Sequence, residues 1–523
     1  MLQIRDLTIV HKKDLREIVK DFRLCLNPGD RAVIIGEEGN GKSTLLKWIY
    51  DPELIGDYAE ARGERVCPGE RLGYLPQELP EGDREKTVFE YFSGRPAFWE
   101  QTPRELAGLA AQLGLEPEFF YGDQRMGSLS GGEKVKAQMA ALLLEQPTIL
   151  LLDEPSNDID IETLEWLERL ILTRKDPVLF ISHDETLIER TANAVVHMER
   201  LKRKTEGRFS VVRLPYREYL KWREERMESQ EQRAETERRE EKKRQEKFRK
   251  IQQKVESDLR SVSRQDPHSG YLLKKKMRTV KAMEKRYERE SQEMTERPET
   301  EEAIYFRLGE GVRMPAGKTV LEYGPAALKA PGDGRKLAKS VFLRVRGGQK
   351  VCIIGKNGAG KTTLIRRIAE ELLARSDVRA AYMPQNYEEL LELEQTPVDY
   401  LDRTGEKEER TRIRTYLGSL KFTADEMDHP IRELSGGQKA KVLLLKMSLS
   451  GADVLILDEP TRNFSPLSGP VIRRMLREYG GAIVSVSHDR KYIEEVCDAV
   501  YRLTPEGLTE DDPAGPGSAP RPE

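Results

Sequence analysis

Two glycine-rich segments of this 523-residue chain have the residue types and spacing that hold a polyphosphate. Residues 36–44 read Gly-Glu-Glu-Gly-Asn-Gly-Lys-Ser-Thr, and residues 355–363 read Gly-Lys-Asn-Gly-Ala-Gly-Lys-Thr-Thr. Each follows a short β-branched run and precedes a helical pattern, so backbone N–H groups and a helix N-terminus should face one anion. The lysine can reach the outer phosphates, and the hydroxyl after it can bind magnesium. The residues predicted at the phosphates are Gly36, Gly39, Gly41, Lys42, Ser43, Thr44, Gly355, Gly358, Gly360, Lys361, Thr362 and Thr363.

Two further segments end in adjacent carboxylates. Residues 149–154 and 454–459 are apolar until their last two positions, which read Asp-Glu in both. Uninterrupted apolar runs are typical of parallel strands buried on both faces, so the acids should lie at a strand end. In phosphoryl transfer, one acid can hold magnesium through water while the other orients or activates the attacking water. This division assigns the metal to Asp153 and Asp458 and a catalytic role to Glu154 and Glu459.

A histidine follows each acidic pair on the next strand pattern. His183 and His488 both stand in a Ser-His-Asp sequence. A single histidine is more often structural than catalytic, but two at matched positions behind phosphate loops favour a catalytic role. We therefore predict that both act beside the glutamates.

Leu-Ser-Gly-Gly sequences at 129–132 and 434–437 each precede a helical pattern. A serine cap and two glycines without side chains leave helix N–H groups open to an anion. An ordinary helix cap would explain one copy poorly and two copies hardly at all. The residues predicted to bind phosphate here are Ser130, Gly131, Gly132, Ser435, Gly436 and Gly437.

Two more segments, Leu75-Pro76-Gln77 and Met383-Pro384-Gln385, complete a set of motifs that occurs twice in one order. The chain thereby resembles ATP-binding-cassette (ABC) domains, in which these segments are the glutamine loops. The resemblance implies an α/β fold class with two tandem ATP-binding-cassette domains, each a mixed sheet core plus a helical subdomain. It also implies ATP hydrolysis with Mg²⁺. The magnesium residues it implies are Ser43, Gln77, Asp153, Thr362, Gln385 and Asp458.

Cassettes of this kind stack head to tail, which implies two composite ATP sites within one functional monomer. The first site joins Gly41, Lys42, Ser43, Gln77, Asp153, Glu154 and His183 to Ser435, Gly436 and Gly437. The second site joins Gly360, Lys361, Thr362, Gln385, Asp458, Glu459 and His488 to Ser130, Gly131 and Gly132. ATP then closes the pair, and hydrolysis lets it open.

A highly charged segment separates the cassettes. Residues 242–286 include 16 basic and five acidic residues, a net charge of +11, although the whole chain carries −3. A proline and a glycine in the sequence 265–270 predict a turn between two helices. The alternative is a solvated linker without packed helices. Apolar residues at helical spacing predict a seam between the helices: Phe248, Ile251, Val255, Leu259, Val262, Met277, Val280, Met283 and Tyr287.

A tandem pair with such a helical-hairpin linker resembles the ABC-F family of ribosome-binding ATPases. The resemblance divides the chain into a first ABC ATPase domain at 1–214, a linker at 215–302 with a basic tip near 258–281, a second ABC ATPase domain at 303–505 and a disordered tail at 506–523. It implies a tip in the ribosomal exit site, near the peptidyl-transferase centre, against ribosomal RNA and tRNA. The tip residues suited to RNA phosphates or base stacking are His268, Tyr271, Lys274, Lys275, Lys276 and Arg278. Tyr271 could equally cap the seam.

Departures from the family pattern favour one subgroup. Ser465 stands where an aspartate is usual, and the first phosphate loop has Glu37 and Glu38, with Glu38 aligned to Asn357, so we infer two non-equivalent ATP sites. The glutamine and the LSGG serine are 53 and 50 residues apart in the two copies, which leaves no room for a large inserted arm. These features resemble antibiotic-resistance, ribosome-protection proteins more than housekeeping translation factors. By resemblance, the drugs are ligands of the peptidyl-transferase centre such as lincosamides, pleuromutilins and group A streptogramins.

Composition argues against several other classes. No apolar run approaches the ~18 residues of a membrane helix, and acidic and basic residues follow Met1 too soon for a signal peptide. Four cysteines in so long a chain do not make a disulfide framework. We therefore expect a cytoplasmic protein without a membrane domain. One alternative is the ATPase pair of a membrane transporter, and the helical linker argues against it. Another alternative is a DNA-repair ATPase, and the presence of two complete cassettes argues against it.

Overall fold

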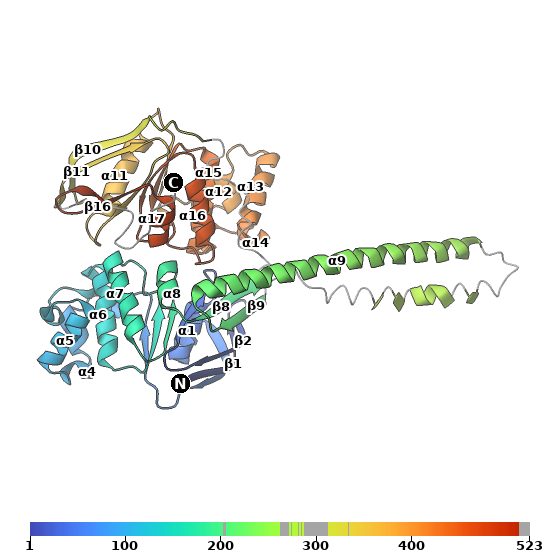
Figure 1. Cartoon of the computed structure of the whole chain (residues 1–523), viewed down its shortest axis with the longest axis horizontal. Helices are drawn as coiled ribbons and strands as arrows, with labels where there is room; N and C mark the ends of the chain where they lie inside the picture. The colour runs from blue at the N-terminus through green and yellow to red at the C-terminus, as the bar shows by residue number, and fades with distance from the viewer. Residues whose placement is uncertain are drawn as a thin grey trace. The chain divides into compact units, whose positions relative to one another are not determined.

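The chain divides into two compact units, one formed by Met1–Tyr216 with Glu301–Glu523 and the other by Arg217–Thr300 (Figure 1). In the computed structural model, the described residues are 1–201, 206–261, 271–272, 275–280, 282–283, 285–286, 312–332 and 334–511. No helix among these residues is both long and apolar enough to cross a membrane.

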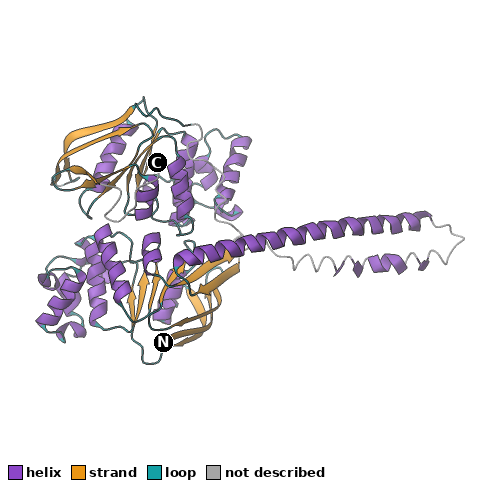
Figure 2. Ribbon diagram, in the orientation of Figure 1, coloured by secondary structure: helices purple, strands orange, loops and turns teal. Residues whose placement is uncertain are grey.

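The first motif copy lies on a six-stranded sheet with the order β5-β6-β7-β3-β8-β9. Five strands run parallel and β9 is antiparallel at the edge. The parallel strands are short and mostly apolar because helices cover both faces of the sheet (Figure 2). The strands are β3 (Arg31–Ile35), β5 (Leu72–Leu75), β6 (Ile149–Asp153), β7 (Val178–Ile181), β8 (Ala194–Leu201) and β9 (Glu206–Val212).

The second copy repeats this sheet with the order β13-β14-β15-β12-β16-β17. Its edge strand β17 is again antiparallel. The repeat places the two Asp-Glu pairs at the same end of equivalent central strands. The strands are β12 (Lys350–Ile354), β13 (Ala380–Met383), β14 (Val454–Asp458), β15 (Ala482–Val486), β16 (Ala499–Leu503) and β17 (Leu508–Asp511).

An antiparallel sheet accompanies each six-stranded sheet. In the first copy it has three strands, β1 (Leu2–His11), β2 (Glu17–Leu26) and β4 (Ala59–Val66); in the second it has two, β10 (Thr319–Lys329) and β11 (Lys336–Arg346). Phe22 on β2 is fully buried, whereas Phe342 on β11 is 45% exposed. Phe22 therefore belongs to the core, as its apolar surroundings require.

The longer helices of the two copies begin after the phosphate loops, the LSGG segments and the strand ends. They are α1 (Lys42–Tyr50), α6 (Gly131–Leu144), α7 (Ile161–Thr173) and α8 (Glu185–Thr191) in the first copy, and α11 (Lys361–Leu373), α15 (Gly436–Ser450), α16 (Gly469–Glu478) and α17 (Arg490–Val496) in the second. Serines cap the two helices that follow the LSGG segments, and aspartates cap α7, α8 and α17. Smaller helices between the glutamine and LSGG segments form the helical part of each copy: α2 (Glu81–Arg84), α3 (Val88–Ser93), α4 (Pro96–Trp99), α5 (Pro103–Leu113), α12 (Pro397–Leu401), α13 (Lys407–Ser419) and α14 (Ala424–Asp428). This arrangement confirms the predicted α/β class with a helical part in each copy.

The linker unit is dominated by α9 (Tyr216–Ser261), a helix of 46 residues. At ~1.5 Å per residue it is about 69 Å long. Residues 275–280 are also helical, but the predicted turn at 265–270 lies outside the described residues.

The predicted seam stays a prediction. Among its residues, Val255 and Val280 are buried, whereas Ile251 and Met283 are 46% and 38% exposed. A seam between two helices hides only a narrow stripe, and residues at its margin keep contact with solvent. The side chains of Leu259, Val262 and Tyr287 are not among those described.

Candidate functional site

The first phosphate loop leaves β3 and turns into α1 through three glycines with positive φ, Gly36, Gly39 and Gly41. Gly36 has φ 152° and Gly41 has φ 85°. A Cβ at Gly36 would lie 2.4 Å from the backbone oxygen of Met198, so only glycine fits there. Lys42 Nζ donates to the backbone oxygens of Gly36 and Glu37 at 3.0 and 3.2 Å. The ammonium group therefore lies inside the curl of the loop, where a phosphate chain would meet it.

The second phosphate loop repeats this geometry. Lys361 Nζ donates to the backbone oxygens of Gly355 and Lys356 at 2.8 and 3.0 Å. Burial lowers the pKa of both loop lysines, while the nearby glutamates Glu154 and Glu459 act in the opposite direction. Both lysines are buried, and phosphate oxygens are suitable partners for their ammonium groups.

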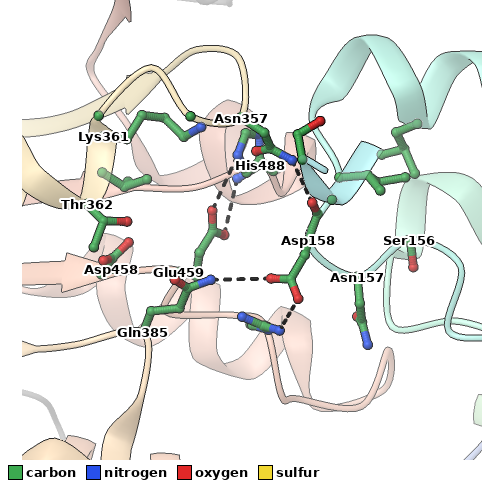
Figure 3. Close-up of a pocket in the computed structure, with 18 of the residues that line it drawn as sticks. Ser156, Asn157, Asp158, Asn357, Lys361, Thr362, Gln385, Asp458, Glu459 and His488 are labelled. Carbon is green, nitrogen blue, oxygen red and sulfur yellow. Dashed lines mark hydrogen bonds and ion pairs between the residues drawn. The ribbon is translucent and has the colours of Figure 1, made fainter. Parts of the chain in front are cut away.

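An aspartate is the last residue of β6 in the first copy and of β14 in the second, and it lies near the hydroxyl of the phosphate loop. Ser43 Oγ donates to Asp153 Oδ1 at 2.9 Å, and the Tyr74 hydroxyl donates to Asp153 Oδ2 at 3.2 Å. In the second copy the Thr362 side chain lies beside Asp458 (Figure 3). Burial raises the pKa of both aspartates to about 6, and the Ser43 and Thr362 hydroxyls offset part of that rise.

These aspartates have the chemistry that a magnesium site needs. By hydrogen-bond geometry, both buried carboxylate oxygens of Asp458 lack a partner among the described residues. The same part of the chain has no group of three or more His, Cys, Asp or Glu side chains that could hold a metal ion without further ligands. A magnesium ion bound through one carboxylate and one hydroxyl would take its remaining ligands from phosphate and water, which is its usual mode with nucleotides.

The two glutamates adjoin the two predicted histidines, but the two pairs differ. His183 Nε2 lies 3.0 Å from Glu154 Oε1, whereas His488 Nε2 lies 3.8 Å from Glu459 Oε1. In both copies the histidine backbone N–H donates to the other carboxylate oxygen, at 3.2 and 3.3 Å. His183 Nδ1 also lies 2.9 Å from the backbone oxygen of Phe464 in the second copy. His488 Nδ1 is buried and has no hydrogen-bond partner among the described residues.

The difference in contacts appears as opposite pKa shifts. Burial raises the pKa of Glu459 to about 8, with the Asp458 charge adding to it. For Glu154, burial also acts upward, but the charge and hydrogen bonds of His183 outweigh it and the pKa is lowered. Burial and the Lys361 charge lower the pKa of His488 to about 4. At neutral pH, therefore, Glu154 is a carboxylate, while Glu459 is largely protonated beside a neutral His488.

The LSGG segment of each copy lies against the phosphate loop of the other. Gly437, at the start of α15, donates its backbone N–H to the carboxylate of Glu38. Glu37, Gly39, Ser435 and Gly437 line the same pocket. A larger cavity of about 730 Å³ is lined by Ser130, Gly131, Gly358, Gly360, Lys361, Thr362, Gln385, Asp458, Glu459 and His488, among others. The structure thus brings together most of the residues predicted for the second composite site. Of those predicted for the first, Ser435 and Gly437 line the smaller pocket, whereas His183 lines the larger cavity.

Asp158 connects the two copies at the second site and was missed in the sequence analysis. Asn357 Nδ2 donates to its backbone oxygen at 2.6 Å, and Arg462 Nη2 lies 2.8 Å from its Oδ2. Gln385 Nε2 donates to Oδ1 at 3.4 Å (Figure 3). The signal in the sequence was the place of Asp158 four residues after Glu154. In the structure Asp158 has φ 57°, a backbone that Asp adopts more readily than most residues.

Ser465 and its aligned counterpart Asp160 play different local roles. Asp160 caps α7 by accepting from the Thr163 N–H at 3.0 Å. Ser465 Oγ instead lies 3.0 Å from Ser468 Oγ and accepts from the Ser468 N–H at 3.2 Å. A hydroxyl can thus replace the carboxylate in local hydrogen bonding but not in charge.

Some predicted residues lie away from these sites or outside the described part. Gln77 does not line the larger cavity, which belongs to the second site. In the linker unit Tyr271 is 68% exposed, and Lys275, Lys276 and Arg278 are exposed as well. His268 and Lys274 lie outside the described residues.

A protein-family model described as "ABC transporter" matches residues 19–157 and 338–462, which together are half of the chain. The curated relatives include "ABC transporter F family member 5" of Arabidopsis thaliana, 26% identical over 94% of this chain and 74% of the relative. They also include "Ribosome protection protein VmlR" of Bacillus subtilis, 28% identical over 94% of this chain and 85% of the relative.

Among solved structures, the archaeal ribosome recycling factor aABCE1, in complex with the ribosomal stalk protein aP1, matches with a TM-score of 0.59 at 19% identity. The match covers 97% of this chain and 90% of that one. "RNase-L Inhibitor" matches with a TM-score of 0.56 at 18% identity, over 96% and 90% of the two chains. At these identities the likeness shows a shared fold.

Proposed function

The chain belongs to the ABC transporter family, as a tandem-cassette ATPase of the ABC-F type, and we propose that it uses ATP to bind the ribosome and to present its linker there. The observation that carries this proposal is the linker. A 46-residue helix leaves the first cassette, and the exposed cations Lys275, Lys276 and Arg278 follow it on the way to the second. A long helix followed by exposed cations, between two ATPase domains in the sequence, suits a phosphate-rich partner.

We assign two ATP molecules to the two composite sites. Each would lie between a phosphate loop of one cassette and an LSGG helix of the other, so ATP would hold the cassettes together. The predicted residues support this assignment, with Lys42 and Lys361 on the phosphates and Gln77 and Gln385 near the outer phosphate. Mg²⁺ would be held by Ser43 with Asp153 and by Thr362 with Asp458, and it would neutralise phosphate charge during hydrolysis.

Glu154 and Glu459 would orient the attacking water, each beside its histidine. Hydrolysis removes the phosphate contacts between the cassettes and lets them separate. Because the linker connects the two cassettes, closing and opening would change its direction and so fix or release its tip.

The proposed position of the tip is the ribosomal exit site, near the peptidyl-transferase centre. There it could shift a bound tRNA or displace a drug, which is the antibiotic-protection role. A relative named as a ribosome protection protein supports this choice. The alternative is a housekeeping translation factor. A cytoplasmic location follows from either role, since the ribosome is there.

A cleavage reagent attached to the tip tests the proposed position. Tyr271→Cys, at a position 68% exposed, would carry a tethered iron chelate that cuts nearby RNA. We expect cuts in ribosomal RNA around the peptidyl-transferase centre when the protein is bound with ATP. The unsubstituted protein sets the background, because its own Cys25 and Cys67 are only partly buried. Cuts confined to another part of the ribosome would contradict the exit-site proposal.

A growth assay separates the two roles. Expression of the chain in a sensitive bacterium should raise the inhibitory concentration of a drug that binds the peptidyl-transferase centre and leave that of a drug acting elsewhere unchanged. The matched control is the Lys42→Ala/Lys361→Ala chain, which lacks both phosphate-binding lysines. Equal growth with the two chains would favour the translation-factor alternative.

A further inference from the structure

A network of ion pairs joins the cassettes at the side of the nucleotide sites. It involves α7 and α8 of the first cassette and α16 and α17 of the second. Arg473 Nη2 lies 2.8 Å from Glu185 Oε2, and Arg490 pairs with Glu168. Three of these four side chains are at least 93% buried, and Arg490 is 85% buried. Ions this well removed from water stay charged only where a partner compensates them.

The network follows the twofold relation between the cassettes. An offset of 305 positions relates the catalytic motifs of the two copies and also relates Glu168 to Arg473 and Glu185 to Arg490. The pair Glu168–Arg490 is therefore the symmetry mate of the pair Arg473–Glu185. In a twofold interface, if one residue contacts a second, the mate of the second contacts the mate of the first. Here the contacting positions obey that rule, but each position that is a glutamate in the first cassette is an arginine in the second.

The supporting ion pairs are reversed in the same way. Within the first cassette, Arg190 Nη1 lies 3.1 Å from Glu168 Oε2. Within the second, Glu495 Oε2 lies 2.8 Å from Arg473 Nε, and Glu495 is the counterpart of Arg190 at the same offset of 305. Each cassette thus carries an opposite charge behind the residue that faces its partner.

Lys491 adds two contacts that have no mate. Its Nζ lies 3.2 Å from Glu185 Oε1 and also pairs with Glu189. The counterpart of Lys491 in the first cassette is Thr186, which carries no charge. The face of the second cassette therefore carries one more positive charge, at Lys491, than the face of the first cassette carries at the aligned position.

We propose that this network is a recognition surface through which each cassette accepts the other cassette and rejects a copy of itself. Two first cassettes paired in the same way would bring Glu168 against Glu185 twice, and two second cassettes would bring Arg473 against Arg490 twice. Like charges that face each other in a buried interface oppose association, so specificity arises from repulsion in the wrong pair as well as attraction in the right one. The phosphate-loop lysine and the LSGG serine and glycines occur in both cassettes, so these groups do not distinguish a cassette from its copy.

The proposal is tested by reversing the charges of one cassette face and then of both faces. The experiment needs no ribosome. Glu168→Arg/Glu185→Arg makes both faces basic, and Arg473→Glu/Arg490→Glu makes both acidic. In a six-residue variant all four changes are combined, and the supporting charges are exchanged with them (Arg190→Glu and Glu495→Arg), so that opposite charges are restored with the cassettes exchanged. All are made in the full chain, and a zero-length carbodiimide links Lys491 to Glu189 wherever the cassettes are paired. Mass spectrometry then measures the yield of the 189–491 crosslink.

We expect each one-sided variant to lose about tenfold or more of the crosslink, as well as of the ATPase activity that composite sites need. The six-residue variant should recover both to within about threefold of the original chain. A matched control reverses Lys339 and Glu506, an exposed pair 2.7 Å apart within the second cassette, and should change neither quantity. Circular dichroism checks that each variant is folded.

Each remaining result contradicts the proposal. If a one-sided variant keeps the crosslink, the network does not select the partner. If both one-sided variants lose it and the six-residue variant does not regain it, the residues matter for packing rather than for complementary charge. Neither result bears on ribosome binding, which the experiment does not involve.

Discussion

Gly437 donates its backbone N–H to the carboxylate of Glu38 across the interface of the two cassettes. At the equivalent place in the second site, Asn357 donates its side-chain N–H to the backbone oxygen of Asp158 at 2.6 Å. At the first site, the Glu38 carboxylate therefore accepts a backbone N–H of the LSGG helix α15. At the second site, the aligned Asn357 bonds to a backbone oxygen instead of to the LSGG helix. The two ATP sites differ in charge at the point where cassette meets cassette.

Replacing Glu38 should strengthen nucleotide binding at the first site. A carboxylate near the LSGG helix repels the phosphates of ATP and occupies one of their donors. We expect Glu38→Asn, in a Lys361→Ala chain whose second site is disabled, to lower the ATP dissociation constant by about fivefold to tenfold, roughly 1–1.4 kcal/mol. Titration calorimetry measures it. Glu37→Asn is the control for charge alone, and an equal gain from it would show that the contact with Gly437 is irrelevant.

The two catalytic glutamates should respond to pH with opposite signs. The pKa of Glu459 is about 8 in the folded chain, so its buried carboxyl keeps a proton that the unfolded chain releases above its ordinary pKa of 4.5. Glu459 therefore weakens folding increasingly as pH rises from about 4.5 to 8. The pKa of Glu154 is lowered, so its stabilising contribution is present above 4.5 and is lost as pH falls through the folded value.

Thermal unfolding of the two glutamine variants measures this contrast. Relative to the original chain, Glu459→Gln should gain stability progressively between pH 5 and pH 8. Glu154→Gln should be less stable by a constant amount over that interval and should lose this deficit only as pH falls below about 4.5. Circular dichroism at several pH values, without nucleotide, gives the melting temperatures. Parallel curves for the two variants would contradict the assigned difference between the sites.

Neutralising the exposed cations beyond α9 should weaken ribosome binding in a salt-dependent way. Each lost phosphate contact reduces the slope of log affinity against log salt by about 0.7–0.9. Lys275→Gln/Lys276→Gln/Arg278→Gln should therefore lower the slope by about 2 to 3, and filter binding at several salt concentrations measures it. The control neutralises three exposed cassette cations, Lys13, Lys407 and Arg412. An equal fall in the control would point to general electrostatics instead of a tip contact.

The residues of the phosphate loops could be predicted because local geometry alone requires them. Gly41 and Gly360 both have positive φ immediately before a helix, and their lysines curl back onto the loop as the spacing implies. The same holds for Ser130 and Ser435, which cap their helices through Glu133 and Gln438. These features depend only on residues that are neighbours in the sequence, so they can be predicted from one sequence.

Contacts between the cassettes could not be predicted in this way. Asp158 and Arg462 stand 304 residues apart, and nothing local indicates that they meet. The pKa difference between Glu154 and Glu459 also depends on packing, since both stand in the same Asp-Glu sequence. The reversed charges at Glu168 and Arg473 become visible in the sequence only after the two copies are aligned, and their meaning requires the interface.

The linker occupies an intermediate position. Its helical character and charge could be predicted from spacing and composition, and α9 confirms the first helix. The exposure of Ile251 and Met283 could not be predicted, because the spacing of apolar residues does not show how much of the first helix the second helix covers.

Sedimentation with ribosomes tests the central claim most directly. A Glu154→Gln/Glu459→Gln chain should bind ATP and stall before hydrolysis, and it should sediment with ribosomes through sucrose when ATP is present and remain above them when ATP is absent. A filter assay on the same preparation checks that ATP is bound. ATP-dependent sedimentation is the result that we predict. Intact ATP binding without sedimentation would contradict the ribosome proposal.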